Sequence, residues 1–434
     1  MLSGVLRGRL RGPLLSPVVL VYMVGFWPTT AGPFLQPQSN QSSVALRHVL
    51  STSSPQALGW SVVASPELQG ASSWTLDGVS CRNAGACIAV GEADYAERAT
   101  GLAETWEGGR WSVVPGPVSG PSWSLDGVSC LSQGCSVLGL GADGAYNAFA
   151  AWDGTKWSPM PGRPGGSLRS DAGGWLMSLS CVTPSFCVAV GHNQAKSVST
   201  FVAAWSGTKW AAKPSPNRGG QETDNVLNAV SCVSRHFCMA VGDYGPQRHS
   251  ESRALVPPSK TLVEAWDGSK WSMVPSPNET PAGKQVSVGE VLSAISCLSS
   301  KLCVAVGSYE YTDVTLTLVE LWDGTRWSVM PSPNPGGQYP SNDELNAVSC
   351  VSVNQCVAVG DYQLVGGLKE GLVETWTGAG WTVESSTSLG APSQGSLRGV
   401  SCASSGNCVA VGWQSVGSPS GDFRPLTEHG LIHD

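Results

Sequence analysis

Leu345-Asn346-Ala347-Val348-Ser349-Cys350, a five-residue loop, and Cys356-Val357-Ala358-Val359-Gly360 form the stretch of sequence that decides the fold. Seven copies of this stretch recur along 434 residues, at intervals of 49, 51, 51, 65, 53 and 52 residues between their first cysteines. Repeats of this period indicate a repeat architecture rather than several ordinary domains. The seven cysteine pairs are Cys81 with Cys87, Cys130 with Cys135, Cys181 with Cys187, Cys232 with Cys238, Cys297 with Cys303, Cys350 with Cys356, and Cys402 with Cys408.

The second half of each repeat is also constant. A polar loop of variable length leads to an apolar segment such as Leu262–Trp266, then a tight turn at Asp267–Lys270, then Trp271–Pro275. One unit therefore holds four apolar segments of about 5–7 residues bounded by Gly, Pro, Asp and Ser, which is typical of strands. Four strands at a period of about fifty residues predict an all-β, seven-bladed β-propeller with four-stranded antiparallel blades.

The two ends of the chain complement each other. The seventh unit begins normally at Leu397–Cys402, matches weakly in its third strand at Pro425–Glu428, and lacks a fourth strand before Asp434. Gly59–Pro66 copies that missing fourth strand and precedes the first complete unit. A linear solenoid would need capping repeats instead. We therefore expect the N-terminal strand to complete the last blade of a propeller that spans residues 59–434.

Each cysteine pair flanks the hairpin between the first two strands, a and b, of its blade. Fourteen cysteines in strict pairs predict seven disulfides, each within its own hairpin. On the chain-entropy estimate, each bridge stabilises the fold by about 2–3 kcal/mol. A zinc site is the alternative, but it favours closer cysteines and nearby histidines, and the six histidines do not follow the repeat. Redox catalysis is disfavoured because seven equivalent pairs indicate a structural role, and we expect no cofactor.

The other repeated side chains also favour structural roles. The W-x-G-x-x-W pairs flank the turn between strands c and d and are expected to pack between blades. Asp153, Asp267 and Asp323, each followed by Gly, are turn formers. Buried carboxylates need hydrogen-bond partners, and a glutamate recurs on the third strand at Glu104, Glu264, Glu320, Glu374 and Glu428. The glycosylation pattern Asn278-Glu279-Thr280 is too common by chance to carry weight.

The N-terminal segment indicates export. Arg7, Arg9 and Arg11 precede an apolar run from Leu14 to Trp27, and small residues follow, which predicts a signal peptide over residues 1–31. Residues 32–58, rich in Ser, Gln and Pro, are expected to be a flexible linker. The alternative is a wrongly assigned start codon upstream of a cytosolic protein. We expect a secreted or cell-surface monomer without a membrane span in its mature form.

Charge excludes one class of partner. Only 13% of residues are charged and the net charge is −7, whereas a nucleic-acid-binding protein usually carries a basic stripe or domain. We therefore expect no nucleic-acid partner.

The S-C-x5-C-x-A-V-G unit with W-x-G-x-x-W resembles repeats of exported bacterial β-propeller proteins of uncharacterised function, over residues 59–430. The turn at Asp153–Trp157 is similar to the Asp-box turn of sialidases but is one residue tighter, and the arginine cluster of that family is absent from the sequence. Kelch-like propellers share a repeated aromatic residue, but their Gly-Gly and Tyr pattern is missing. These resemblances imply a propeller and no particular chemistry.

Two functions remain open: a binding module for a carbohydrate, cell-wall or protein ligand, and an extracellular hydrolase or lyase acting on polysaccharide. The sequence contains no set of unlike catalytic groups, phosphate loop or nucleophile elbow, so binding is favoured over catalysis. Loops b–c and d–a, on the face that we call the top, vary in length, whereas loops a–b and c–d, on the bottom face, are uniform. Variable loops on a rigid scaffold commonly hold binding sites.

Two groups of residues are candidates for ligand binding on the top face. The first follows the leading Leu of strand a at the mouth of the central channel; Met177 and Ser293 occupy this position in two blades, and the candidates are Asp77, Asp126, Asn228, Asn346 and Arg398. The second lies in the long b–c loop of the fourth unit and comprises Tyr244, Arg248, His249 and Arg253. Such a polar ring can hold water, a cation or a sugar hydroxyl. The alternative is a solvated channel and a mobile loop.

Overall fold

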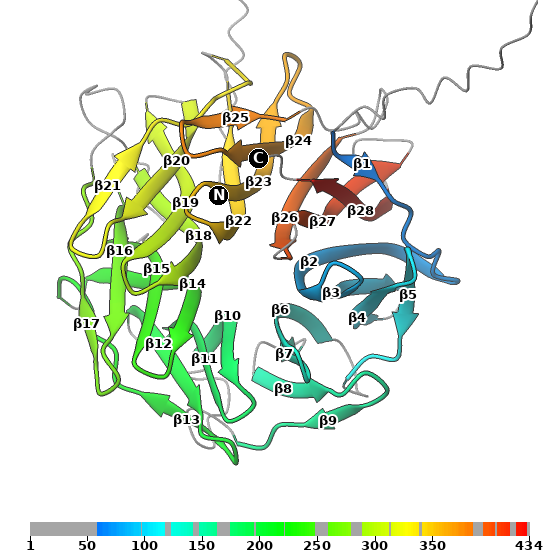
Figure 1. Cartoon of the computed structure of the whole chain (residues 1–434), viewed down its shortest axis with the longest axis horizontal. Coiled ribbons are helices and arrows are strands. Elements are labelled where there is room, and N and C mark those ends of the chain that lie inside the picture. Colours follow the sequence, from blue (N-terminus) through cyan, green and yellow to red (C-terminus); the bar gives the residue numbers. More distant parts are fainter. Residues whose placement is uncertain are drawn as a thin grey trace, which may run out of the picture. The chain divides into compact units, whose positions relative to one another are not determined.

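The computed structural model describes residues 59–96, 98–117, 123–141, 147–162, 174–194, 197–220, 222–247, 259–278, 289–311, 314–337, 341–384, 394–403, 406–416 and 422–431. All of them belong to one compact unit, Pro55–Asp434. The predicted signal peptide and linker lie outside the described residues. The described residues form 28 strands in seven four-stranded antiparallel sheets, and they include no helix that could cross a membrane. The predicted seven-bladed β-propeller is confirmed (Figure 1).

Blades 1 to 6 take four consecutive strands each, from β2–β5 to β22–β25, and blade 7 takes β26, β27, β28 and β1. Strand a, nearest the channel in Figure 1, is β2 (Ala71–Asn83), β6 (Trp123–Leu131), β10 (Gly174–Thr183), β14 (Thr223–Ser234), β18 (Gly289–Ser299), β22 (Glu344–Ser352) or β26 (Gly395–Cys402). Strand b is β3 (Ala86–Tyr95), β7 (Gly134–Gly141), β11 (Phe186–Gln194), β15 (Phe237–Pro246), β19 (Leu302–Tyr311), β23 (Gln355–Gln363) or β27 (Asn407–Val416). Strand c is β4 (Arg98–Glu107), β8 (Asn147–Trp152), β12 (Val198–Trp205), β16 (Lys260–Trp266), β20 (Val314–Trp322), β24 (Lys369–Trp376) or β28 (Asp422–Leu431). The outer strand d is β5 (Arg110–Val114), β9 (Trp157–Pro159), β13 (Trp210–Lys213), β17 (Trp271–Met273), β21 (Trp327–Met330), β25 (Trp381–Val383) or β1 (Ser61–Val62).

The chain ends close the ring as predicted. In β1, Ser61 lies opposite His429 and Val62 opposite Glu428, and the Val63 amide donates to the Thr427 carbonyl at 2.8 Å. Gly430 stands where other third strands carry Trp, and a Cβ there would lie 2.5 Å from the Trp60 ring. The glycine therefore makes room for the indole of the N-terminal strand.

Inner strands are longer than the 5–7 residues expected from their apolar segments. Strand β2 has 13 residues and β14 has 12. Backbone pairing continues into polar residues, such as Asp224 opposite Gly245, because the ladder hydrogen bonds do not require apolar side chains.

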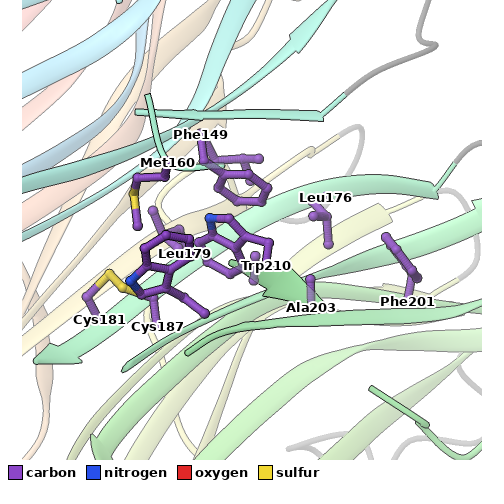
Figure 2. Close-up of a cluster of buried hydrophobic side chains, with 12 residues drawn as sticks. Phe149, Met160, Leu176, Leu179, Cys181, Cys187, Phe201, Ala203 and Trp210 are labelled. Atoms are coloured by element: carbon purple, nitrogen blue, oxygen red, sulfur yellow. A yellow bond between two sulfur atoms is a disulfide. The ribbon is translucent and has the colours of Figure 1, made fainter. Parts of the chain in front are cut away.

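The hydrophobic core is divided into seven clusters, each between two neighbouring blades. Figure 2 shows the cluster between blades 2 and 3, where Phe149 and Trp210 stack with ring centroids 3.9 Å apart and Leu176 and Leu179 lie nearby. Trp111, Trp210 and Trp327 are 4%, 2% and 5% exposed and belong to the core as predicted. Trp157, Trp266 and Trp376 pack against the core but are only partly buried. Each blade is therefore stabilised chiefly by its neighbours.

A ring of hydrogen bonds joins the innermost strands. In every blade the serine before the first cysteine accepts a hydrogen bond from the backbone amide of the equivalent cysteine in the next blade. Donor and acceptor are 2.9–3.1 Å apart in all seven cases. The Cys81 amide donates to Ser401 Oγ at 3.0 Å, so the ring also spans the seam between blades 7 and 1.

The seven predicted disulfides are confirmed, each within its own a–b hairpin, with Cα–Cα separations of 3.9–4.0 Å. From blade 1 to blade 7 the bonded pairs are Cys81 with Cys87, Cys130 with Cys135, Cys181 with Cys187, Cys232 with Cys238, Cys297 with Cys303, Cys350 with Cys356, and Cys402 with Cys408. No cysteine of the described residues is free, so the pairing leaves none of them for a zinc site. Seven bridges indicate an oxidising environment.

The predicted turn formers hold the c–d turns. Asp153 Oδ1 accepts hydrogen bonds from the amides of Thr155 and Lys156 at 2.8 and 2.9 Å, and Asp267 and Asp323 make the same bonds in their turns. Hydroxyl hydrogen bonds from Ser269 and Thr325, together with the backbone bonds, lower the pKa of Asp267 and Asp323 to about 2. The backbone bonds, followed by the Thr155 hydroxyl, lower the pKa of Asp153 to about 2. The bottom-face turns of blades 2, 4 and 5 therefore share one fixed geometry.

Candidate functional site

The predicted mouth position is a β-bulge in every blade. Strand pairing places Leu76 opposite Gly91 and Gly78 opposite Val90, so Asp77 is left without a partner on strand b. The equivalent ladders skip Asp126, Met177, Asn228, Ser293, Asn346 and Arg398. A bulge redirects the side chain of its extra residue and is common beside functional sites. The sequence analysis did not anticipate it.

The repeated A-V-G glycine is the sequence signal for this bulge. A Cβ at Gly91 would lie 2.1 Å from the Thr75 carbonyl oxygen, and one at Gly360 would lie 1.8 Å from that of Glu344. Strand a approaches strand b so closely before the bulge that only glycine fits there.

Candidate residues of blades 7, 1 and 2 interact at one side of the mouth. Arg398 forms an ion pair with Asp77 across the seam where the ring closes. Asp77 and Arg398 also act electrostatically on Glu92 of strand β3, a residue that the sequence analysis missed. Burial, and then the charges of Asp77 and Asp94, raise the pKa of Glu92, against a smaller lowering by Arg398.

Asp126 belongs to the same group. Burial raises its pKa to about 6, the charges of Asp77 and Glu92 add to this effect, and a hydrogen bond from Ser124 opposes it. The Ser124 hydroxyl lies 3.2 Å from Asp126 Oδ1. Asp77, Glu92, Asp126 and Arg398 together form what we call the mouth cluster.

The amide candidates join neighbouring blades. Asn228 Nδ2 donates to the Leu292 carbonyl of blade 5 at 3.0 Å, and Asn346 Nδ2 donates to the Leu397 carbonyl of blade 7 at 3.0 Å. Each also lies 3.5 Å from an aspartate of its own strand b, Asp243 or Asp361. The structure thus brings these two residues into contacts with the next blade rather than into the mouth cluster.

A second polar group lies beside Asn346. The Asp361 carboxylate is 3% exposed and accepts a hydrogen bond from Ser396 Oγ at 2.7 Å. Lys369 Nζ lies 2.7 Å from the other carboxylate oxygen. Lys369 therefore compensates the charge of Asp361, and the hydrogen bond from Ser396 connects blades 6 and 7.

Of the four loop candidates, one is described. Tyr244 lies opposite Asn225 near the end of β15, and the Arg218 guanidinium carbon stands 5.5 Å from its ring centroid. Arg248, His249 and Arg253 lie outside the described residues, so their role stays a prediction.

The repeated glutamates of strand c are buried in latches between blades. Ser215, which follows strand d of blade 3, donates to Glu264 of blade 4 at 2.7 Å. Ser65, Ser276 and Ser332 make the same contact with Glu104, Glu320 and Glu374 at 3.0, 2.8 and 2.7 Å. Burial raises the pKa of Glu104, Glu264 and Glu320 to about 7 and that of Glu374 to about 8. These contacts agree with the structural role predicted for the glutamates.

The serine partners escaped the sequence analysis, although the repeat contains the signal. Where the serine is replaced by Gly116 or Gly162, the following blade has Ala150 or Ala203 at the glutamate position. In these blades the serine and the glutamate are therefore replaced together. Asn278 belongs to this Ser-Pro-Asn segment, where its Oδ1 accepts from the Thr261 amide at 2.8 Å and its Nδ2 donates to the Ser276 carbonyl at 3.1 Å. The Asn278 side chain therefore joins strand c to the segment that follows strand d.

Among the residues that the structure describes, no group of three or more His, Cys, Asp or Glu side chains is placed to hold a metal ion. The mouth cluster consists of three carboxylates and one guanidinium. It can accept hydrogen bonds through its carboxylates and donate them through the guanidinium.

No protein-family model and no curated protein matches this chain. Solved structures are similar to it in fold. YCF48 bound to a D1 peptide is 12% identical, covering 87% of this chain and 97% of that one, with a TM-score of 0.49. A protein of unknown function from Dyadobacter fermentans DSM 18053 is 10% identical over 86% and 98%, with a TM-score of 0.46. Sqt1 from Chaetomium thermophilum is 11% identical over 79% and 95%, with a TM-score of 0.43.

Proposed function

We propose that this chain is an exported binding module that takes a carbohydrate or protein ligand on its top face, at the mouth cluster and the loops around it. The observation that carries this proposal is the meeting of Asp77, Glu92, Asp126 and Arg398 from three successive blades. Binding sites typically place a few convergent polar groups on a rigid frame. The disulfides support export, and the resemblance to exported bacterial repeat proteins agrees with it.

A carbohydrate is the ligand that this cluster fits best. Carboxylates accept hydrogen bonds from sugar hydroxyls, and the Arg398 guanidinium donates to ring and hydroxyl oxygens. The fixed backbone around the bulges reduces the entropy lost when such a ligand binds.

One observation favours the alternative, a polysaccharide hydrolase or lyase. Asp126 has a raised pKa of about 6 and lies near carboxylates that differ from it in environment. A carboxyl group whose pKa is raised towards neutrality is a candidate general acid.

The test is a glycan array run beside a polysaccharide-cleavage assay, with the natural chain and with the Asp77→Asn and Asp126→Asn variants. We expect retention of specific glycans without cleavage, and at least tenfold weaker retention by both variants. Glu222→Gln, an exposed carboxylate on the same face, is the matched control and should bind normally. None of the three substitutions should lower the free energy of unfolding by more than about 0.5 kcal/mol. Glycan cleavage that Asp126→Asn abolishes would establish the enzyme instead, and unchanged binding by both mouth variants would refute the proposed site.

A further inference from the structure

The uniform bottom face is positively charged although the chain is not. Five c–d turns end in a cation directly before the tryptophan of strand d: Arg110, Lys156, Lys209, Lys270 and Arg326. The a–b loops add Arg82, Arg235 and Lys301, and the acidic residues that the structure describes on this face are Glu107, Asp153, Asp267 and Asp323. Among the described residues, eight cations against four carboxylates leave this face at +4, in a chain with a net charge of −7. The cations belong to blades 1 to 5, and we call them the cation arc.

The turn cations of the arc are held out into solvent by rigid backbone. All five are exposed, and the Arg326 side chain is 82% exposed. The Asp153, Asp267 and Asp323 carboxylates accept backbone hydrogen bonds that fix the turns. Lys156, Lys209, Lys270 and Lys301 form no ion pair with any residue that the structure describes.

Neighbouring loops that carry cations lie close together. In blade 5, Gly324 lies in the c–d turn two residues before Arg326. A Cβ on Gly324 would lie 3.2 Å from Lys301 of the a–b loop. In blade 4 the Trp266 indole donates to the Arg235 carbonyl at 3.0 Å, beside the turn that ends at Lys270. Clustered cations of this kind raise the local concentration of an anionic partner.

The surroundings of the arc distinguish between kinds of polyanion. Trp111, Trp210, Trp271 and Trp327, which follow four of the five turn cations, are no more than 6% exposed and offer no platform for stacking nucleic-acid bases. Trp157, which follows Lys156, is partly exposed, so the arc presents a single tryptophan rather than a series of them. Of the exposed large apolar side chains that the structure describes, Val353 and Leu431 lie on this face, in blades 6 and 7. The arc itself therefore presents charge without apolar groups that would enter a membrane.

We propose that the cation arc is a second binding surface, which docks a linear anionic polysaccharide. Repeated turns present cations at one equivalent place in consecutive blades, and a polymer with a negative group in each repeat matches such a series. This surface lies on the face opposite the mouth cluster, so its occupancy is independent of the proposed top-face ligand.

The test measures retention on immobilised heparin at several salt concentrations. Lys156→Gln with Lys209→Gln should lower the salt at elution and reduce the slope of log affinity against log salt by about two. The matched control, Lys213→Gln with Lys260→Gln, removes two exposed cations outside the arc and should leave both quantities unchanged. Gly380→Lys places a cation in the blade 6 turn, where a Cβ meets nothing within 4 Å, and should increase the slope by about one.

Three results would overturn the proposal: equal losses in the arc and control variants, no gain from Gly380→Lys, or tighter binding at equal salt to single-stranded DNA or phosphatidylglycerol vesicles than to heparin. Asp77→Asn and Asp126→Asn should retain heparin binding in full. The glycan array therefore tests the mouth cluster, and heparin retention tests the cation arc, so that either proposal can be refuted without the other.

Discussion

At the scale of the residue, one glycine in each blade permits the geometry of the mouth. Gly360 lies opposite Leu345, at the step where strand a skips Asn346. The close approach of Glu344 to Gly360 exists because the bulge shifts strand a against strand b. The bulge that turns the Asn346 side chain out of the strand pairing therefore depends on the missing side chain at Gly360.

Gly360→Ala should lower the free energy of unfolding by about 1–3 kcal/mol, because its Cβ would meet the Glu344 carbonyl oxygen and the strands would have to separate. Urea denaturation with the disulfides intact measures the change. Gly220→Ala, whose Cβ meets nothing within 4 Å, should have no destabilising effect. Equal stability of the two variants would mean that the bulge is not as tight as described.

At the scale of the element, the buried glutamates of strand c make stability depend on pH. Their pKa values of about 7 to 8 lie above the unfolded value of 4.5, so the folded chain binds more protons than the unfolded chain between these limits. The stabilisation is complete below about pH 4.5 and is lost as the pH rises through 7 to 8. Asp126, with a pKa of about 6, acts in the same direction.

We therefore expect the free energy of unfolding to fall between pH 5 and pH 8, by roughly 1–3 kcal/mol for each latch glutamate. His429, whose pKa burial lowers to about 4, acts in the opposite direction, but only below about pH 6.5. Chemical denaturation at pH 5, 6, 7 and 8 gives the profile. A variant with Gln at Glu104, Glu264, Glu320 and Glu374 should show a flatter one. Stability that is constant or rises over this range would contradict the protonated latches.

Local repeats explain which elements could be predicted from the sequence. The blade count, the hairpin bridges such as that of Cys81 with Cys87, and the turn at Asp153 follow from residues close together in the chain. The bulge at Asp77 could not be found in this way, because an extra residue on one strand is visible only against the register of its partner. Likewise, the contacts of Asn228 with Leu292 and of Ser215 with Glu264 join separate blades, and their distance depends on the curvature of the ring.

At the scale of the whole molecule, the seam between blades 7 and 1 closes the ring. The pairing of β1 with β28, the Arg398–Asp77 ion pair and the Cys81–Ser401 hydrogen bond all cross between the two ends of the chain. Arg424 adds a cation–π contact, with its guanidinium carbon 4.1 Å from the Trp74 ring centroid. The sequence predicted the missing strand but not these side-chain contacts, since their partners are at least 320 residues apart.

Deleting residues 59–66 should leave β28 as an open edge, expose the cavity that Trp60 fills beside Gly430, and remove the Ser65 partner of Glu104. Loss of a buried tryptophan alone destabilises a protein by about 3–5 kcal/mol. We expect a sharply lower melting temperature by calorimetry, whereas a deletion that ends at residue 58 should melt like the full chain. Unchanged melting of the 59–66 deletion would show that β1 does not hold the ring closed.

The pairing of β1 with β28 also sets an order in time. The ribosome makes Ser61 first and its partner His429 after another 368 residues. At about 5–20 residues per second this delay lasts roughly 20–70 s. The first strand to be synthesised is thus the last to find its place, and blades 1 to 6 can assemble as an open arc before it does. Any chain whose synthesis stops before Asp422 never gains a partner for its own beginning.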